Sequence, residues 1–430
     1  MKLILRMTLC LALVGSLATL ACSATYIEVT APGNRLLKLA IVPPQPLGAT
    51  VQPDLANEMA EVQAFDLTMS GLFTAERRDA APLSQGLGLS MVDYVPWLTA
   101  GYDLLIRGEY VLRGDELTVE FRLFDVLNKK SLLVKRYLGH RADLRQFAHA
   151  FSDEVLASLA GEKGPFTSRI VFVSSQSGNK EIFLMDWDGH NPQQITRSGA
   201  ITLSPDISPD GREIIFTSYK RGNPDLYKRA LSSTVEVPVS TRPGVNITGA
   251  WSPDGSKIAL ALSKDGNTEL YTVNRDGSAP NRLTVTHAAN LSPAWSPDGT
   301  RIAFVSDRLG KPHIFVIDAN GGNLRRLTTN NGNNFNPAWS PKGDKIAYTH
   351  MVDGFQIFVC NIDGNGETQL TSEGSNERPR WSSDGRLLAF SSKRNGAEAI
   401  YVMRADGSGQ TKVSRTAGKN IHPVWTPRRQ

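Results

Sequence analysis

Cysteine is scarce in this sequence, with three residues among 430. Cys10 and Cys22 lie in an N-terminal apolar segment that we expect to be removed, which leaves Cys360 alone in the mature chain. A single cysteine cannot form an intramolecular disulfide. The protein must therefore be stabilised by its hydrophobic cores, and its length is sufficient for two or three domains.

Long hydrophobic runs are also lacking, apart from one at residues 7–21. This run follows two basic residues and precedes three small ones, a pattern typical of a secretory signal peptide. It is shorter than the ~20 apolar residues that a membrane-spanning helix needs. We expect residues 1–24 to be a signal peptide cleaved after Ala24, and the mature chain not to insert into the membrane. The alternative is a lipoprotein signal with lipidation of Cys22, but Thr19 stands where an aliphatic residue is usual.

Charge of one sign is not concentrated anywhere along the sequence. The formal net charge of +5 falls to +3 when Lys2 and Arg6 leave with the signal peptide, and no run of five or more Lys or Arg occurs. The sequence therefore predicts neither nucleic-acid binding nor a polybasic membrane patch.

Motifs for catalysis and metal binding are missing as well. There is no Gly-x-Ser-x-Gly, so the nucleophile turn of a hydrolase is absent. The seven His are scattered, no Cys-x-x-Cys occurs, and the Asp-Gly pairs lack the spacing of a calcium loop. We predict that the protein is not an enzyme and uses no metal or cofactor.

An internal repeat dominates the second half of the chain. Ser-Pro-Asp-Gly occurs at 208–211, 252–255 and 296–299, with weaker copies at 340–343, 382–385 and 426–427. Six copies with a period of about 40 to 45 residues are typical of β-propeller blades, each a four-stranded sheet. In the third repeat the expected strands are 293–295, 301–306, 313–318 and 324–328.

The ends of the repeat array predict how the ring closes. The array begins at residues 168–173 with a second-type strand, and it ends at residues 422–425 with an inner strand. We expect the last strand to complete the first blade, which leaves no sheet edge open. Large apolar residues end the inner strands and should pack blade against blade: Ile207, Trp251, Trp295, Trp339, Trp381 and Trp425.

Residues 35–163 show no repeat and have the pattern of a small α/β domain. A strand is expected at 37–42, a helix at 53–69, a strand pair at 110–112 and 116–126, and a second helix at 142–159. The predicted fold is therefore an α/β N-terminal domain at 35–163, followed by an all-β six-bladed propeller at 164–430.

The segment 25–34 precedes both domains and has two interpretations. Chain ends are usually frayed and inert. However, apolar residues alternate with polar ones in this segment, which suits addition of a strand to the sheet of a partner protein. The residues concerned are Tyr26, Ile27, Glu28, Val29 and Thr30.

A polar residue recurs five positions before the end of each inner strand, where the chain enters that strand near the channel mouth. Asparagine is common in turns because its side chain bonds to nearby backbone, which is one explanation. The other is a ring of amide and hydroxyl groups that faces a ligand above the channel. The residues are Thr202, Asn246, Asn290, Asn334, Asn376 and Asn420.

The order of these features resembles the TolB family. The resemblance covers the whole mature chain: a cleaved signal, a short N-terminal segment, an α/β domain, and six Trp-Ser-Pro-Asp-Gly blades closed by Pro-Val-Trp-Thr-Pro at 423–427. It implies a non-enzymatic periplasmic component of the Tol-Pal system, which supports outer-membrane integrity and constriction at cell division. A secreted propeller of a peptidase-like protein, or one that binds a small peptide or glycan, is the alternative.

The resemblance also implies partners. The propeller face around the channel would bind the peptidoglycan-associated lipoprotein Pal, through loops that include Val245, Asn246, Thr248 and Leu291. The segment from Tyr26 to Thr30 would engage TolA. Val245 and Leu291 are apolar here and depart from the family pattern, so the face is better defined than any one residue. Other envelope proteins and bacteriocins are further candidate partners, and the protein is expected to be monomeric.

Overall fold

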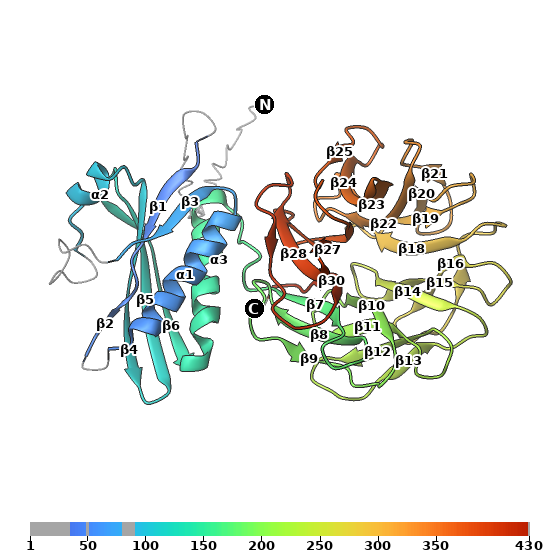
Figure 1. The fold of residues 1–430 in the computed structure, drawn as a ribbon, viewed down its shortest axis with the longest axis horizontal. Coiled ribbons are helices and arrows are strands. Elements are labelled where there is room, and N and C mark those ends of the chain that lie inside the picture. Colours follow the sequence, from blue (N-terminus) through green and yellow to red (C-terminus); the bar gives the residue numbers. More distant parts are fainter. Residues whose placement is uncertain (1–34, 49–50, 80–90, 429–430) are drawn as a thin grey trace, which may run out of the picture.

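The computed structural model describes residues 35–48, 51–79 and 91–428 of the chain. These residues form an α/β domain and a ring of six sheets that lie side by side (Figure 1). The predicted fold class, an α/β domain followed by a six-bladed propeller with four strands per blade, is confirmed.

The α/β domain contains one mixed sheet with the order β3-β1-β4-β5-β6. Strand β1 pairs in parallel with both of its neighbours, while β4, β5 and β6 form an antiparallel meander. The strands are β1 (Leu37–Ile41), β2 (Gln45–Pro46), β3 (Phe73–Arg77), β4 (Leu104–Arg113), β5 (Glu116–Asp125) and β6 (Lys130–His140).

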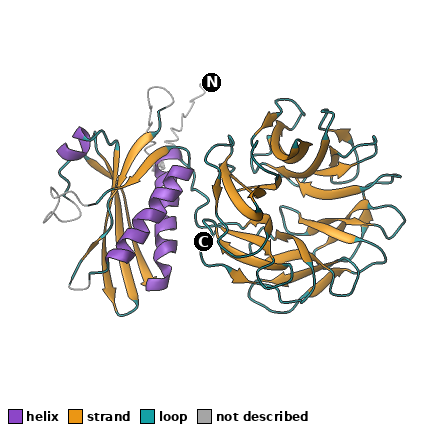
Figure 2. Ribbon diagram, in the orientation of Figure 1, coloured by secondary structure: helices purple, strands orange, loops and turns teal. Residues whose placement is uncertain are grey.

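Two long helices cover one face of this sheet (Figure 2). Helix α1 (Pro53–Met69) begins at a proline, which is favourable at the first helical position. Helix α3 (Leu144–Ala160) follows a 3-10 turn (Arg141–Asp143) and ends at Gly161 in the left-handed conformation. Their apolar faces bury the core of the domain, and the short helix α2 (Val95–Thr99) contributes Trp97 to a second cluster.

Each propeller blade is an antiparallel meander that runs outward from the channel. The inner strands are β10 (Thr202–Ile207), β14 (Asn246–Trp251), β18 (Asn290–Trp295), β22 (Asn333–Trp339), β26 (Asn376–Trp381) and β30 (Asn420–Trp425). The second strands are β7 (Arg169–Ser174), β11 (Glu213–Ser218), β15 (Lys257–Leu262), β19 (Arg301–Ser306), β23 (Lys345–Val352) and β27 (Leu387–Asn395). The third strands are β8 (Glu181–Asp186), β12 (Asp225–Ala230), β16 (Glu269–Asn274), β20 (His313–Asp318), β24 (Gly354–Asn361) and β28 (Ala397–Arg404). The outer strands are β9 (Gln193–Gln194), β13 (Val237–Ser240), β17 (Asn281–Arg282), β21 (Arg325–Arg326), β25 (Thr368–Gln369) and β29 (Thr411–Lys412).

The ring closes through the C-terminal strand. Strand β30 pairs with β7, so the first blade has the order β30-β7-β8-β9. Tryptophans at the ends of the inner strands also connect blades, because the indole N–H of Trp295, Trp381 and Trp425 donates to a carbonyl of the preceding blade at 3.1 to 3.2 Å.

The α/β domain packs against the first and sixth blades. Trp187, in the loop after β8, is fully buried, and its ring centroid lies 5.0 Å from that of Phe65 on α1. Beside it, His149 Nδ1 is 2.9 Å from an oxygen of Asp66, and Nε2 is 3.5 Å from an oxygen of Asp188 in the propeller. Burial alone would lower the pKa of His149, but these two carboxylates raise it to about 10. A buried ionic contact therefore joins the two domains.

Candidate partner-binding face of the propeller

The recurring polar residues lie at the start of the inner strands, as their spacing predicts. Their side chains are buried, with at most 2 % exposure. This holds for Thr202, Asn246, Asn290, Asn334, Asn376 and Asn420.

Asn290 shows what these side chains do. Its amide nitrogen donates to Glu269 Oε2 on β16 and to Thr286 Oγ1, both at 2.8 Å. Its amide oxygen accepts from Arg308 at 2.7 Å. Both polar atoms of the amide are therefore satisfied within the fold, as buried polar groups require.

The same arrangement recurs around the ring. Asn246, Asn334 and Asn376 each place their amide nitrogen 2.9 to 3.3 Å from a side chain on the third strand of the preceding blade. Asn420 bonds to the loop that precedes it, and Thr202 bonds to Ser198. Each of these groups is turned into the protein and bonded there, which favours the explanation that they stabilise turns over the ring of groups that faces a ligand. They fix the loops of this face.

The loops above these residues form the surface that a partner could reach. We call this surface the channel face. It includes the loops that join the second strand of each blade to the third. It also includes the loops that join each outer strand to the inner strand of the next blade, and the strand ends beside both kinds of loop. Its exposed large apolar side chains are Ile201, Tyr219, Val285, Leu309, Met351 and Val352. Exposed apolar side chains of this size can serve as anchors for a partner protein.

The channel face is also basic. Its loops carry ten Lys or Arg and four carboxylates. The basic residues are Lys180, Arg197, Lys220, Arg221, Arg242, Lys264, Arg308, Lys311, Arg415 and Lys419, and the acidic ones are Asp265, Asp307, Asp353 and Glu373. Such a face favours an acidic partner and accelerates the encounter with it.

The remaining sequence-predicted residues have separate positions. Val245 belongs to the channel face and is half-buried, whereas Leu291 packs against the apolar cluster between two blades. Thr248 lines the channel itself. The segment from Tyr26 to Thr30, like Cys22 and the cleavage position, lies outside the described residues.

Sequence reasoning missed the exposed apolar residues, although the repeat contains a signal for them. Val285 stands where the neighbouring repeats have Thr241 and Thr329, 44 residues away on either side. Leu309 likewise stands where they have Asp265 and Asp353. Both side chains are largely exposed, so packing within the chain does not explain these exchanges.

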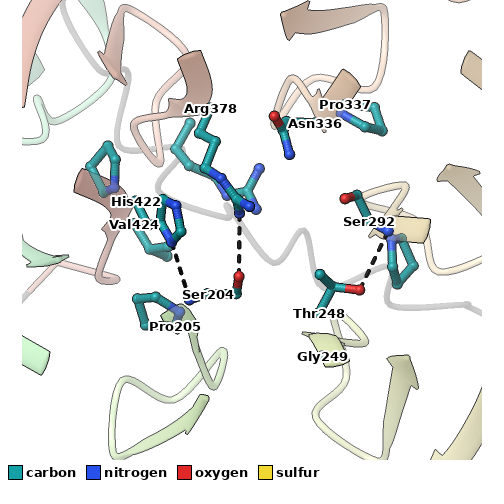
Figure 3. A pocket seen from close by; sticks show the side chains of 13 residues that line it. Ser204, Pro205, Thr248, Gly249, Ser292, Asn336, Pro337, Arg378, His422 and Val424 are labelled. Carbon is teal, nitrogen blue, oxygen red and sulfur yellow. Dashed lines mark hydrogen bonds between the residues drawn. The ribbon is translucent and has the colours of Figure 1, made fainter. Parts of the chain in front are cut away.

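A narrow channel lies at the centre of the ring between the six inner strands, and Figure 3 shows side chains that line it. At its constriction the cavity is about 20 Å³, lined by one polar residue from the middle of each inner strand. In every blade the strand pairing shifts register at this residue, which has a positive φ of 49 to 57°. A bulge of this kind redirects a side chain. We call these residues the bulge ring: Ser204, Thr248, Ser292, Asn336, Arg378 and His422.

Beyond the bulge ring the channel widens at the opposite end. There the tryptophans and the Ser-Pro-Asp-Gly turns enclose about 350 Å³.

Two further findings concern the described residues only. No helix among them is long and apolar enough to cross a membrane. No group of three or more His, Cys, Asp or Glu side chains in this part of the chain could hold a metal ion.

Comparisons with known proteins match both domains. A family model described as the TolB beta propeller domain matches residues 156–429, and one described as the TolB amino-terminal domain matches residues 25–132. Proteins named Tol-Pal system protein TolB from Geobacter sulfurreducens and Geobacter metallireducens are each 64% identical to this chain, over 94% of its length and 93% and 94% of theirs. The crystal structure of TolB from Acinetobacter baumannii superposes with a TM-score of 0.80 at 25% identity, covering 91% of this chain and 97% of that one.

Proposed function

Because the chain belongs to the TolB family of Tol-Pal system proteins, we propose that it is a periplasmic binding protein without catalytic activity. In this proposal the channel face binds the peptidoglycan-associated lipoprotein Pal, and the segment from Tyr26 to Thr30 engages TolA. The complex would support outer-membrane integrity and constriction at division.

The observation that carries the Pal proposal is the character of the channel face. It combines exposed apolar side chains with an excess of basic ones. The α/β domain packs against the first and sixth blades and approaches this face at the loop that holds Val413 and Arg415. Apolar anchors surrounded by charged groups are the usual composition of a protein interface. The buried asparagines support the proposal indirectly, because they hold the loops of this face in a defined shape.

The proposal is tested by calorimetric titration of the mature protein with the soluble domain of Pal. The test variant is Val285→Asp with Leu309→Asp, which changes two side chains that are 79% and 59% exposed. The matched control is Val235→Asp with Leu324→Asp, which makes the same changes at side chains 65% and 44% exposed in loops at the other end of the blades.

We expect the test variant to lose at least about tenfold in affinity, since two apolar anchors are replaced by charges that an acidic partner repels. The control variant should bind like the wild type. Equal affinities for all three proteins would show that Pal does not dock on the channel face. Absence of binding by the wild type would remove the Pal proposal itself.

The TolA proposal needs a separate experiment. A chain that starts at residue 31 should fail to bind TolA in a pull-down and should still bind Pal. If it retains TolA, the N-terminal segment is not the docking element.

A further inference from the structure

Two arginines with no close counterion line the channel at the bulge ring. Arg378 is a member of the ring, and Arg380, two residues further along β26, lines the same constriction. Among the described residues, neither guanidinium has a carboxylate within 4.0 Å. Asp206 and Glu377 act on them only from a longer distance. Burying a charge without a counterion costs free energy of folding. A bound anion would offset part of that cost at this position.

Within the described part of the chain, the Arg378 side chain makes one hydrogen bond, and it is long. Its guanidinium donates to Ser204 Oγ across the ring at 3.4 Å (Figure 3). A guanidinium has five N–H donors, so most of its donor capacity remains available to a ligand in the channel.

Other members of the ring add donors. The backbone N–H of Ser204 donates to Nδ1 of His422 at 3.2 Å, so in the neutral ring the proton must lie on Nε2, which is then a donor. Burial and the nearby Arg378 lower the pKa of His422 well below its ordinary value, which keeps the ring neutral. The side chains of Ser292 and Asn336 line the remaining wall (Figure 3).

The local charge balance also favours an anion. Burial and the neighbouring Arg380 lower the pKa of Arg378 to about 10, so it stays charged at neutral pH. Burial raises the pKa of Asp206 to about 6, so this carboxylate compensates the arginines incompletely in mildly acidic solution.

The size of the constriction limits the ligand. About 20 Å³ is little more than the space for one water molecule. A nucleotide, a sugar phosphate or a folded segment cannot enter it, whereas one halide ion or the head of one carboxylate can.

We propose that the bulge ring is a binding site for one compact monovalent anion, held by Arg378 and Arg380 with hydrogen bonds from the polar side chains around the channel. The bound anion is either a free ion such as chloride or the carboxylate group of a larger molecule. Both are compact and carry one negative charge. The site does not depend on the binding of Pal, because all of its donors belong to this chain.

The experiment uses ³⁵Cl NMR line broadening of chloride solutions that contain the mature protein. The variants are Arg378→Gln and, separately, Arg380→Gln. The control is Arg415→Gln, which removes an exposed arginine of the channel face. We expect the excess line width to fall at least about fivefold in each channel variant and to be unchanged in the control. Circular dichroism checks that each variant is folded.

A second measurement avoids substitutions. Crystals of the unaltered mature protein grown in bromide should show one anomalous peak beside Arg378. Equal line widths in all variants, or bromide density distributed over surface arginines with none in the channel, would overturn the proposal. Acetate competition separates the sources: displacement of chloride by acetate shows that a carboxylate fits, and failure to displace it assigns the site to the free halide.

Discussion

The two ends of the propeller are built from the same repeat but differ in character. The channel face carries ten basic and four acidic residues in its loops. The loops at the other end, which we call the turn face, carry four basic and eleven acidic residues within the described range. The channel-face loops vary from blade to blade, whereas three turns of the turn face have the sequence Ser-Pro-Asp-Gly and three others keep part of it.

The hydrogen bonds explain this difference. On the turn face, the hydroxyl of Ser252 donates to Asp254 at 2.6 Å, and Ser296 donates to Asp298 in the same way. The polar groups of these turns bond within the turn and hold its shape. On the channel face the hydrogen bonding that recurs from blade to blade lies below the surface, at the buried asparagines. The residues above them differ between blades. The similar sequences of the turn face therefore reflect a structural role. The varied loop sequences of the channel face are compatible with partner binding.

The largest expected loss of stability follows substitution of a tryptophan at the turn-face end of an inner strand. Trp425→Ala should lower the free energy of unfolding by roughly 3 to 5 kcal/mol, because it removes a large buried ring from the closing strand. Trp425→Phe should cost less, since most of the packing remains. Denaturant titrations of both variants measure this. A loss below 1 kcal/mol for the alanine variant would show that the ring of tryptophans is not what holds the blades together.

A smaller loss of stability is expected beneath the channel face. Asn290→Ala should lower the free energy of unfolding by about 2 to 3 kcal/mol, because Glu269 and Arg308 lose a buried hydrogen-bond partner. Affinity for Pal, measured well below the melting temperature, should be nearly unchanged. If affinity falls while stability does not, the asparagines act as contact groups after all.

Charge reversal should distinguish the two faces kinetically. Lys311→Glu on the channel face should slow association with Pal by roughly threefold to tenfold at low ionic strength, while Lys342→Glu on the turn face should leave the rate unchanged. Stopped-flow measurements give both rates. The difference should disappear in high salt, because exposed charges are then screened. Equal slowing by both variants would mean that only net charge matters.

The smallest expected effect is a change in how the stability of the turn face depends on pH. Hydrogen bonds from Ser296 and from the backbone and hydroxyl of Thr300 lower the pKa of Asp298 from 3.8 to about 2. A lowered pKa adds stability above pH 3.8 that is lost as the pH falls towards 2. For so exposed a group we expect less than about 1 kcal/mol. Asp298→Asn and Ser296→Ala should each flatten the acid limb of the stability curve, and an unchanged acid limb in both would refute this assignment.

The blades were predictable because their signals are local. A Pro-Asp-Gly turn fixes its own geometry, and strands on either side of it must pair. Helix α1, expected at 53–69, has those bounds, whereas α3 starts two residues later than expected because residues 141–143 form a 3-10 turn. In contrast, the spacing of Asn290 is visible in the sequence, but whether its amide points inward or outward depends on Glu269 and Arg308, which other strands supply.

The sequence by itself determined the period of the repeat, the number of blades, the closure by the last strand and the family. These follow from short-range geometry repeated six times. Only the tertiary structure decided which polar residues are buried and which surround the channel. Ser204 and Arg378 are 174 positions apart, and they meet because the closed ring turns the middle residue of every inner strand toward one axis. No local pattern encodes a contact of that kind, since it exists only when all six blades are in place.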